Sequence, residues 1–124
     1  MKHLFLVMAG GAIGSGLRHL FGRAALTVFG PGFPWGTLGV NLIGGLAMGL
    51  LAGVLARGGG GEATRLLLGV GVLGGFTTFS AFSLDTVTLI ERGQMVAALG
   101  YVAVSIAGAF AALAIGLQLT RGTA

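Results

Sequence analysis

Charged residues are scarce in this chain. Only 8% of its 124 residues are Asp, Glu, Lys or Arg, whereas about 25% of an ordinary soluble domain is charged. Hydrophobic residues make up 55% of the chain, and the mean hydropathy is +0.99. This composition excludes a soluble globular fold, because too little polar surface exists to cover the core. It also excludes disorder, since disordered chains are polar and highly charged.

Cysteine is absent and proline is rare. The lack of cysteine excludes disulfides, thiolate chemistry and cysteine-ligated metals. With 2 prolines and no Gly-X-Y repeat, the 26 glycines do not indicate collagen. The formal net charge of +4 rests on 7 basic residues spread along the chain, so no nucleic-acid partner is expected. No Ser–His or paired-carboxylate arrangement is evident, and we do not expect an enzyme.

Four apolar stretches are each long enough to cross a membrane, which takes about 20 residues. Each is bounded by charges or by a turn, such as the Gly-Pro-Gly-Phe-Pro segment at 30–34. We therefore expect an all-α, multi-pass protein of the cell (inner) membrane, with the lipid bilayer around a single domain of residues 1–124. The expected helices are at about 3–29, 35–56, 65–90 and 94–119.

Small residues recur four positions apart, the spacing that lets membrane helices approach closely. The positions are Gly10 and Gly14; Gly45, Gly49 and Gly53; Gly71 and Gly75; and Gly108, Ala112 and Gly116. Most of these residues are expected to be packing notches. Which of them face a second subunit stays open.

Basic residues are divided almost evenly between the two sides of a four-helix topology. The two groups are Lys2, Arg57, Arg65 and Arg121 on one side, and Arg18, Arg23 and Arg92 on the other. The positive-inside rule needs an imbalance to fix one orientation. The sequence therefore predicts insertion both ways and pairing as an antiparallel, dual-topology homodimer, with a single orientation as the alternative.

Residues 74–83, which read Gly-Gly-Phe-Thr-Thr-Phe-Ser-Ala-Phe-Ser, lie within the third apolar stretch. Two glycines followed by two β-branched threonines weaken a helix, so we expect the third helix to break mid-membrane at Gly74–Gly75. Carbonyls freed there need partners and can coordinate a small hard cation. Phe79 and Phe82 share a helical face, from which their positive ring edges can face an anion. The alternative is a kinked helix whose hydroxyls bond its own carbonyls.

Three blocks of this sequence resemble the Fluc, or CrcB, family of small fluoride channels. They are Gly-Gly-Phe-Thr-Thr-Phe-Ser-Ala-Phe at 74–82, Gly-Thr-Leu-Gly-Val-Asn-Leu-Ile-Gly at 36–44, and Gly-Gly-Ala-Ile-Gly at 10–14 with Arg18. The resemblance implies an antiparallel homodimer with two fluoride pores and a structural sodium ion at its centre. It further implies passive fluoride export that reduces cytoplasmic fluoride toxicity. Ala81 stands where the family usually has threonine, which removes one hydroxyl from the expected polar track.

The resemblance also implies roles for individual residues. Backbone carbonyls of Gly74 and Thr77 would hold the sodium ion, and Arg18 would stabilise the anion or brace the dimer. The other expected pore residues are Asn41 as an amide donor, Thr37, Phe79 and Phe82 through their ring edges, Ser80, and the polar pair Tyr101 and Ser105. Asp85 matches an acidic position near the end of the third helix.

Two other function classes stay open. A small multidrug-resistance-type, proton-coupled exporter needs a membrane-embedded carboxylate, but the first, second and fourth expected helices contain no Asp or Glu. A structural membrane subunit would show no flux as a purified protein. Individual residues also have structural interpretations: Arg18 as a snorkelling side chain, Asn41 as an interhelical contact, and Tyr101 as a residue of the interfacial belt.

Overall fold

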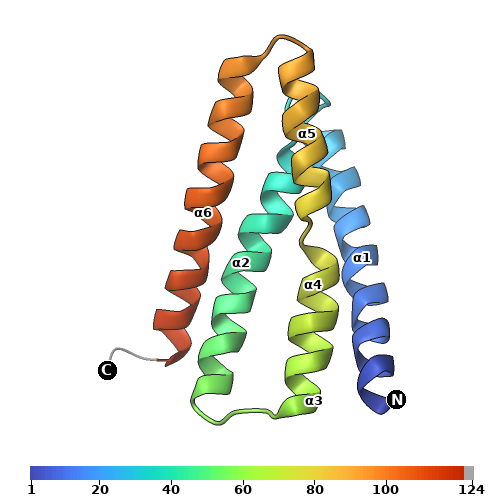
Figure 1. The fold of residues 1–124 in the computed structure, drawn as a ribbon, viewed down its shortest axis with the longest axis vertical. Coiled ribbons are helices and arrows are strands. Elements are labelled where there is room, and N and C mark those ends of the chain that lie inside the picture. The colour runs from blue at the N-terminus through green and yellow to red at the C-terminus, as the bar shows by residue number, and fades with distance from the viewer. Residues whose placement is uncertain (122–124) are drawn as a thin grey trace.

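The computed structural model describes residues 1–121, which are helical apart from short connections (Figure 1). Four helical spans are long and apolar enough to cross a membrane: Lys2–Phe29, Trp35–Ala56, Glu62–Glu91 and Met95–Arg121. The expectation of an all-α protein with four candidate membrane spans is therefore confirmed.

The spans correspond to α1 (Lys2–Phe29), α2 (Trp35–Ala56), a composite third span, and α6 (Met95–Arg121). The third span consists of α3 (Glu62–Thr64), η1 (Arg65–Leu73), α4 (Gly74–Phe76) and α5 (Phe79–Glu91). Glycines with positive φ, at Gly30 (78°) and Gly93 (78°), end α1 and α5, because a residue without Cβ adopts this conformation freely. The N-terminus, the loop after α2 and the end of α6 lie at one end of the molecule (Figure 1).

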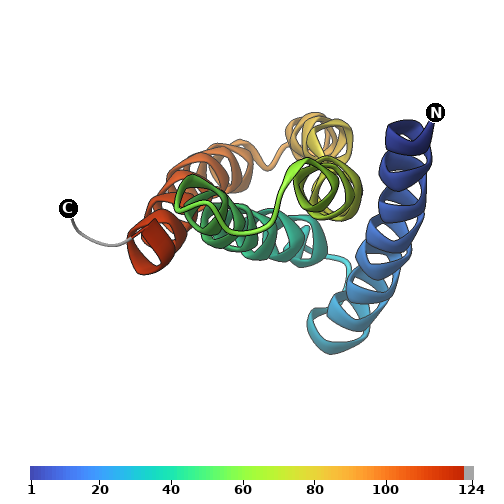
Figure 2. The ribbon, with the colours of Figure 1, turned by 90° about the horizontal axis from the view of Figure 1, so that it is seen from below.

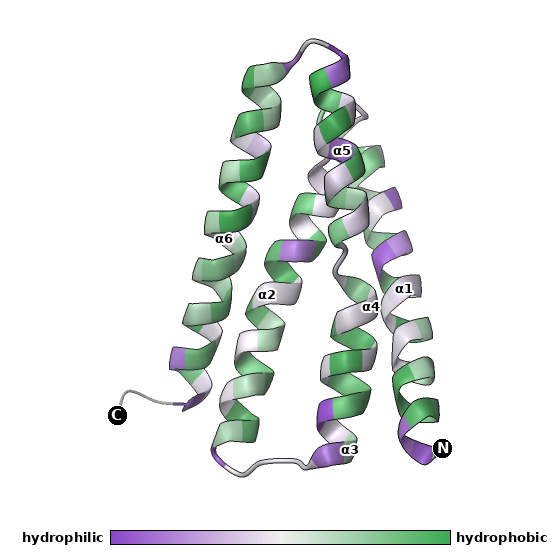
Figure 3. Ribbon diagram, in the orientation of Figure 1, coloured by the Kyte–Doolittle hydropathy of each residue, from purple (hydrophilic) through white to green (hydrophobic). Residues whose placement is uncertain are grey.

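The four spans form an open arrangement rather than a closed bundle. α2 packs mainly on α6, and α1 packs mainly on η1 and α4. α1 and α6 lie at opposite edges, as Figure 2 shows from below. Large apolar side chains consequently remain on the outside: Phe79 is 78% exposed and Phe110 is 73% exposed. Figure 3 shows hydrophobic residues along most of each span, as lipid contact or a second subunit requires.

Glycines allow α1 to lie directly against the third span. A Cβ at Gly14 would overlap the carbonyl oxygen of Val72, and one at Gly75 would lie 2.6 Å from the carbonyl oxygen of Gly11. The backbones of α1, η1 and α4 therefore touch without intervening side chains. This is the close approach that small residues four apart provide in a membrane.

Glycines have the same role between α2 and α6. A Cβ at Gly49 would overlap the carbonyl of Leu113, and one at Gly116 would lie 2.5 Å from the carbonyl oxygen of Leu46. These small-residue sets thus mediate contacts within a single chain. The sequence alone left open which of them face a second subunit.

The first part of the third span is wider than an α-helix. η1 has the five-residue hydrogen-bond spacing of a π-helix, and the Gly74 N–H continues it by donating to the carbonyl of Gly69. Such wide turns are uncommon and often lie near functional sites. Here the wide segment is followed by the single turn of α4 and then by the interruption of the third span.

Candidate functional site

The third span is interrupted at Thr77 and Thr78. Gly74 has helical angles (φ −62°, ψ −39°), whereas Thr77 (φ −82°, ψ 161°) and Thr78 (φ −154°, ψ 124°) are extended. The expected position at Gly74–Gly75 is therefore wrong by a few residues. β-Branched residues favour extended backbone, and Gly75 instead allows the close approach of α1.

Asn41 of α2 pairs with the extended backbone in both directions. Its Nδ2 donates to the Thr78 carbonyl at 3.1 Å, and the Thr78 N–H donates to its Oδ1 at 2.9 Å. One turn further along α2, a Cβ at Gly44 would overlap the Thr77 methyl group, so the absence of a side chain there makes room for Thr77. One face of α2 thus supports both extended residues.

Two carbonyls at the interruption lose the donors that a continuous helix would supply. In an α-helix each N–H bonds the carbonyl four residues earlier. The Thr78 N–H, which would reach Gly74, bonds Asn41 instead. The Ala81 N–H, which would reach Thr77, bonds the Thr78 hydroxyl at 3.1 Å. The carbonyls of Gly74 and Thr77 are therefore available to another partner.

Arg18 of α1 donates a hydrogen bond to a third carbonyl at the interruption, that of Gly75. Its Nε donates to the Gly75 oxygen at 3.2 Å, and the side chain is half-buried. The guanidinium group braces α1 against α4 within one chain and places a positive charge beside the interruption. Arg18 is thus not merely a snorkelling side chain.

The hydroxyls of this region follow two patterns. Thr77 and Ser83 donate to carbonyls four residues earlier, at 3.0 and 2.9 Å, as the kinked-helix interpretation expects. The Thr78 Oγ1 instead caps α5 and lies 3.4 Å from the Ser80 Oγ. The alternative interpretation therefore describes only part of the hydroxyl set.

A groove of about 520 Å³ lies between α2, α6 and the start of α5. Four of the expected pore residues line it: Asn41, Phe79, Phe82 and Ser105. The rings of Phe79 and Phe82 have centroids 5.7 Å apart. Ser105 is 6% exposed, and its Oγ has no hydrogen-bond partner among the described residues. An unpaired buried hydroxyl is costly, and this one is available to a further hydrogen-bond partner.

Comparison with known proteins gives a consistent picture. The family described as "CrcB-like protein, Camphor Resistance (CrcB)" matches residues 5–117. A Sphingopyxis alaskensis protein named "Fluoride-specific ion channel FluC" is 61% identical over 122 residues, which cover 98% of this chain and 97% of the relative. A protein of the same name from Mesorhizobium japonicum is 52% identical, covering 98% of each chain.

The chain belongs to the CrcB family. Another relative with the same printed name, from Novosphingobium aromaticivorans, is 54% identical and covers 95% of each chain. Membership thus extends over nearly the whole chain, including all the elements that form the groove.

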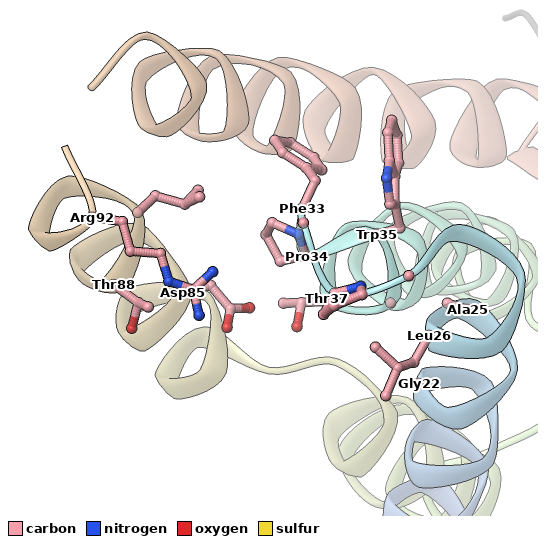
Figure 4. A pocket seen from close by; sticks show the side chains of 15 residues that line it. Gly22, Ala25, Leu26, Phe33, Pro34, Trp35, Thr37, Asp85, Thr88 and Arg92 are labelled. Carbon is pink, nitrogen blue, oxygen red and sulfur yellow. The ribbon is translucent and has the colours of Figure 1, made fainter. Parts of the chain in front are cut away.

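A second pocket, of about 310 Å³, lies in this CrcB chain near the turn between α1 and α2. Figure 4 shows Asp85 of α5 and Arg92, which follows α5, on one side of it and Thr37 of α2 on the other. The Tyr101 hydroxyl donates to Asp85 Oδ2 at 3.2 Å, and the Tyr101 ring lies 5.2 Å from that of Phe82. Tyr101 is fully buried, and its contacts connect Asp85 of this pocket with Phe82 of the groove.

Of the remaining expected residues, only Thr77 lines the groove. Thr37 lines the second pocket and also a third pocket of about 270 Å³, where it meets Arg18 and Ala81. Ser80 is exposed on the first turn of α5. Thr77 lines the groove, whereas Gly74 is exposed on α4.

Two functional contacts were not predicted from this CrcB sequence. The first is Thr78, which caps α5 and pairs with Asn41; a threonine that follows a helix-weakening segment and precedes a new helix was the available signal. The second is the bond between Asp85 and Tyr101. Their separation of 16 residues across two helices carries no sequence signal.

Proposed function

We propose that this chain forms a fluoride-selective channel that lets fluoride leave the cell passively and so reduces its cytoplasmic toxicity. The observation that carries the proposal is the groove in which Asn41, Phe79, Phe82 and Ser105 meet. CrcB relatives at 50–61% identity bear the name of fluoride-specific ion channels. No covalent chemistry is involved in this function, and the chain is not an enzyme.

The groove offers fluoride uncharged hydrogen-bond donors. The Asn41 amide carries two hydrogens; one is donated to the Thr78 carbonyl, and the other remains available to an ion. Ser105 contributes an unpaired hydroxyl. The edges of the Phe79 and Phe82 rings are weakly positive. Such groups replace hydration water yet release the ion, which conduction requires.

The carbonyls of Gly74 and Thr77 fit a sodium ion, because their helical donors are diverted and oxygen is the ligand that hard cations prefer. A bound cation would supply positive charge beside the groove. Two carbonyls are fewer than the six or so oxygens that such cations usually take. A second copy of the chain would supply the equivalent pair and bring the protein oxygens to four, which favours a homodimer with the sodium ion at its centre.

The dimer is proposed to be antiparallel and to lie in the inner membrane. Near-equal numbers of basic residues on the two sides favour neither orientation. Thr77 and Thr78 lie near the midpoint of the Glu62–Glu91 span. The interruption would thus lie in mid-membrane in either orientation, where two antiparallel copies can bring their carbonyls together.

Fluoride efflux from liposomes containing the purified chain tests the proposal. Efflux is expected for the native chain, with chloride excluded. Phe79→Ile should lower the rate by about tenfold, because ring-edge contacts contribute about 0.5–1.5 kcal/mol each and also shape the groove. Phe5→Ile, at an exposed position on α1, is the matched control and should keep the native rate.

The alternatives predict other results. A structural subunit gives no flux from the purified chain, and a proton-coupled exporter gives flux that depends on a proton gradient. Equal rates for Phe79→Ile and the native chain would contradict the assignment of the groove.

A further inference from the structure

We propose that Asn41 is a positioning residue for the cation site, in addition to its place in the groove. Its side chain holds Thr78 extended, and this conformation, in which the Thr78 hydroxyl also takes the Ala81 N–H, leaves the Gly74 and Thr77 carbonyls available. The inference rests on the proposed role of these carbonyls as sodium ligands. It adds that a side chain that does not touch the cation determines how tightly the cation binds.

The argument begins with competition for one hydrogen atom. The Thr78 N–H has two alternative acceptors: Asn41 Oδ1, which it bonds at 2.9 Å, or the Gly74 carbonyl, which it would bond in a continuous helix. A carbonyl that accepts an N–H in a helix is a poorer cation ligand, because the donor's partial positive charge lies in front of it. By capturing this N–H, Asn41 keeps the Gly74 oxygen free.

The second half of the pairing fixes the other side of Thr78. Asn41 Nδ2 donates to the Thr78 carbonyl at 3.1 Å, so the amide satisfies both backbone groups of that residue. Unpaired backbone groups at membrane depth are costly, and Asn41 removes this cost for the extended conformation. Without Asn41, closing the helix through Thr77 and Thr78 would lower the free energy of the chain.

α2, which carries Asn41, is fixed in place by close packing on α6. A Cβ at Gly44 would overlap the Thr77 methyl, and one at Gly49 would overlap the Leu113 carbonyl of α6. α2 is thus packed between α6 and the interruption with little freedom to shift. The half-site for the cation is therefore supported by contacts within one chain.

Sodium-dependent thermal unfolding of the purified full chain in detergent tests the inference. Choline replaces sodium at constant ionic strength, and the sodium concentration giving half-maximal stabilisation is measured. Asn41→Leu removes both hydrogen bonds and should raise this concentration by about tenfold or more, as the loss of one or two buried hydrogen bonds implies. Asn41→Ser is too short to form the pair and carries the same expectation.

Ser105→Ala is the matched control, because Ser105 lines the same groove but makes no bond to the interruption. It should slow fluoride efflux without moving the sodium midpoint. The inference would be overturned if the sodium midpoint stayed within about twofold of native in both Asn41 variants. A change that small is less than the loss of one hydrogen bond implies. A native chain that conducts fluoride with no stabilisation by sodium would also overturn the inference. A native chain that does not conduct fluoride at all contradicts the proposed function instead.

Discussion

All three polar groups of Thr78 form hydrogen bonds at the interruption. Its N–H and carbonyl pair with Asn41, and its hydroxyl accepts the Ala81 N–H. The hydroxyl therefore acts as the N-cap of α5, a position at which threonine stabilises the helix that follows. It also keeps the Ala81 N–H away from the Thr77 carbonyl.

Thr78→Ala should thus have two effects. The unfolding free energy should fall by about 1 kcal/mol through loss of the cap. The freed Ala81 N–H should bond the Thr77 carbonyl and weaken sodium binding. Thr78→Ser retains the oxygen and should behave like the native chain in the same sodium-dependent unfolding measurement. Identical behaviour of the two variants would argue against the capping role.

Tyr101 makes its hydrogen bond in a fully buried position. Tyr101→Phe removes the donor to Asp85 and should lower the unfolding free energy by about 1–2 kcal/mol, because a carboxylate loses its partner. Thr27→Val is the control: Thr27 donates to the Arg23 carbonyl on an exposed face, and its loss should change stability little. Unfolding of each variant in detergent gives the comparison, and equal stabilities of Tyr101→Phe and the native chain would contradict it.

The residue types of the site were predictable, but their partners were not. The sequence singles out Asn41, Phe79, Phe82 and Ser105, and the fold places them around one groove. The pairing of Asn41 with Thr78 depends on how α2 lies against the third span, and no local pattern encodes that. The fluoride roles of these residues remain predictions, as does the sodium role of the Gly74 and Thr77 carbonyls.

At the scale of helices, glycine decides which backbones can touch. Gly116 of α6 faces α2, and a Cβ there would lie 2.5 Å from the Leu46 carbonyl oxygen, whereas a Cβ at Gly100 of the same helix would meet nothing within 4 Å. Gly116→Ala should therefore destabilise the fold by about 1–3 kcal/mol through overpacking.

Gly100→Ala is the matched control in the same unfolding experiment. It should be neutral or stabilising, because alanine favours a helix over glycine by up to about 1 kcal/mol. A similar loss of stability in both variants would mean that helix propensity or an external contact, rather than the contact with α2, governs these positions.

Charge and hydropathy predicted where the helices begin and end more accurately than they predicted the type of helix. α2 spans Trp35–Ala56, the uncharged stretch before Arg57, and α6 extends two residues beyond the expected 119. The π-helical geometry of η1 was not predicted, because a segment that is apolar on all sides has no periodicity from which to measure residues per turn. The position of the interruption depended on α1 and α2, which bond its carbonyls and N–H groups.

At the scale of the whole molecule, both orientations of the chain should be present in one membrane. The chain has no cysteine, so Gly61→Cys, in the loop after α2 where an added Cβ would meet nothing within 4 Å, places a single reactive thiol at one end. A membrane-impermeant thiol reagent should label this site from either side in comparable amounts. Labelling from one side alone would show a single orientation and contradict dual topology.

The glycine contacts also bear on how this protein can change over evolution. Gly14, Gly49 and Gly116 meet carbonyls of their own chain, whereas the outer surface carries large side chains such as Leu20 and Leu99. If the chain dimerises as proposed, the fold of one subunit and its fit to another would thus depend on different kinds of residue. After a gene duplication, two copies can diverge in pairing preference through outer side chains while each keeps the same internal helix contacts.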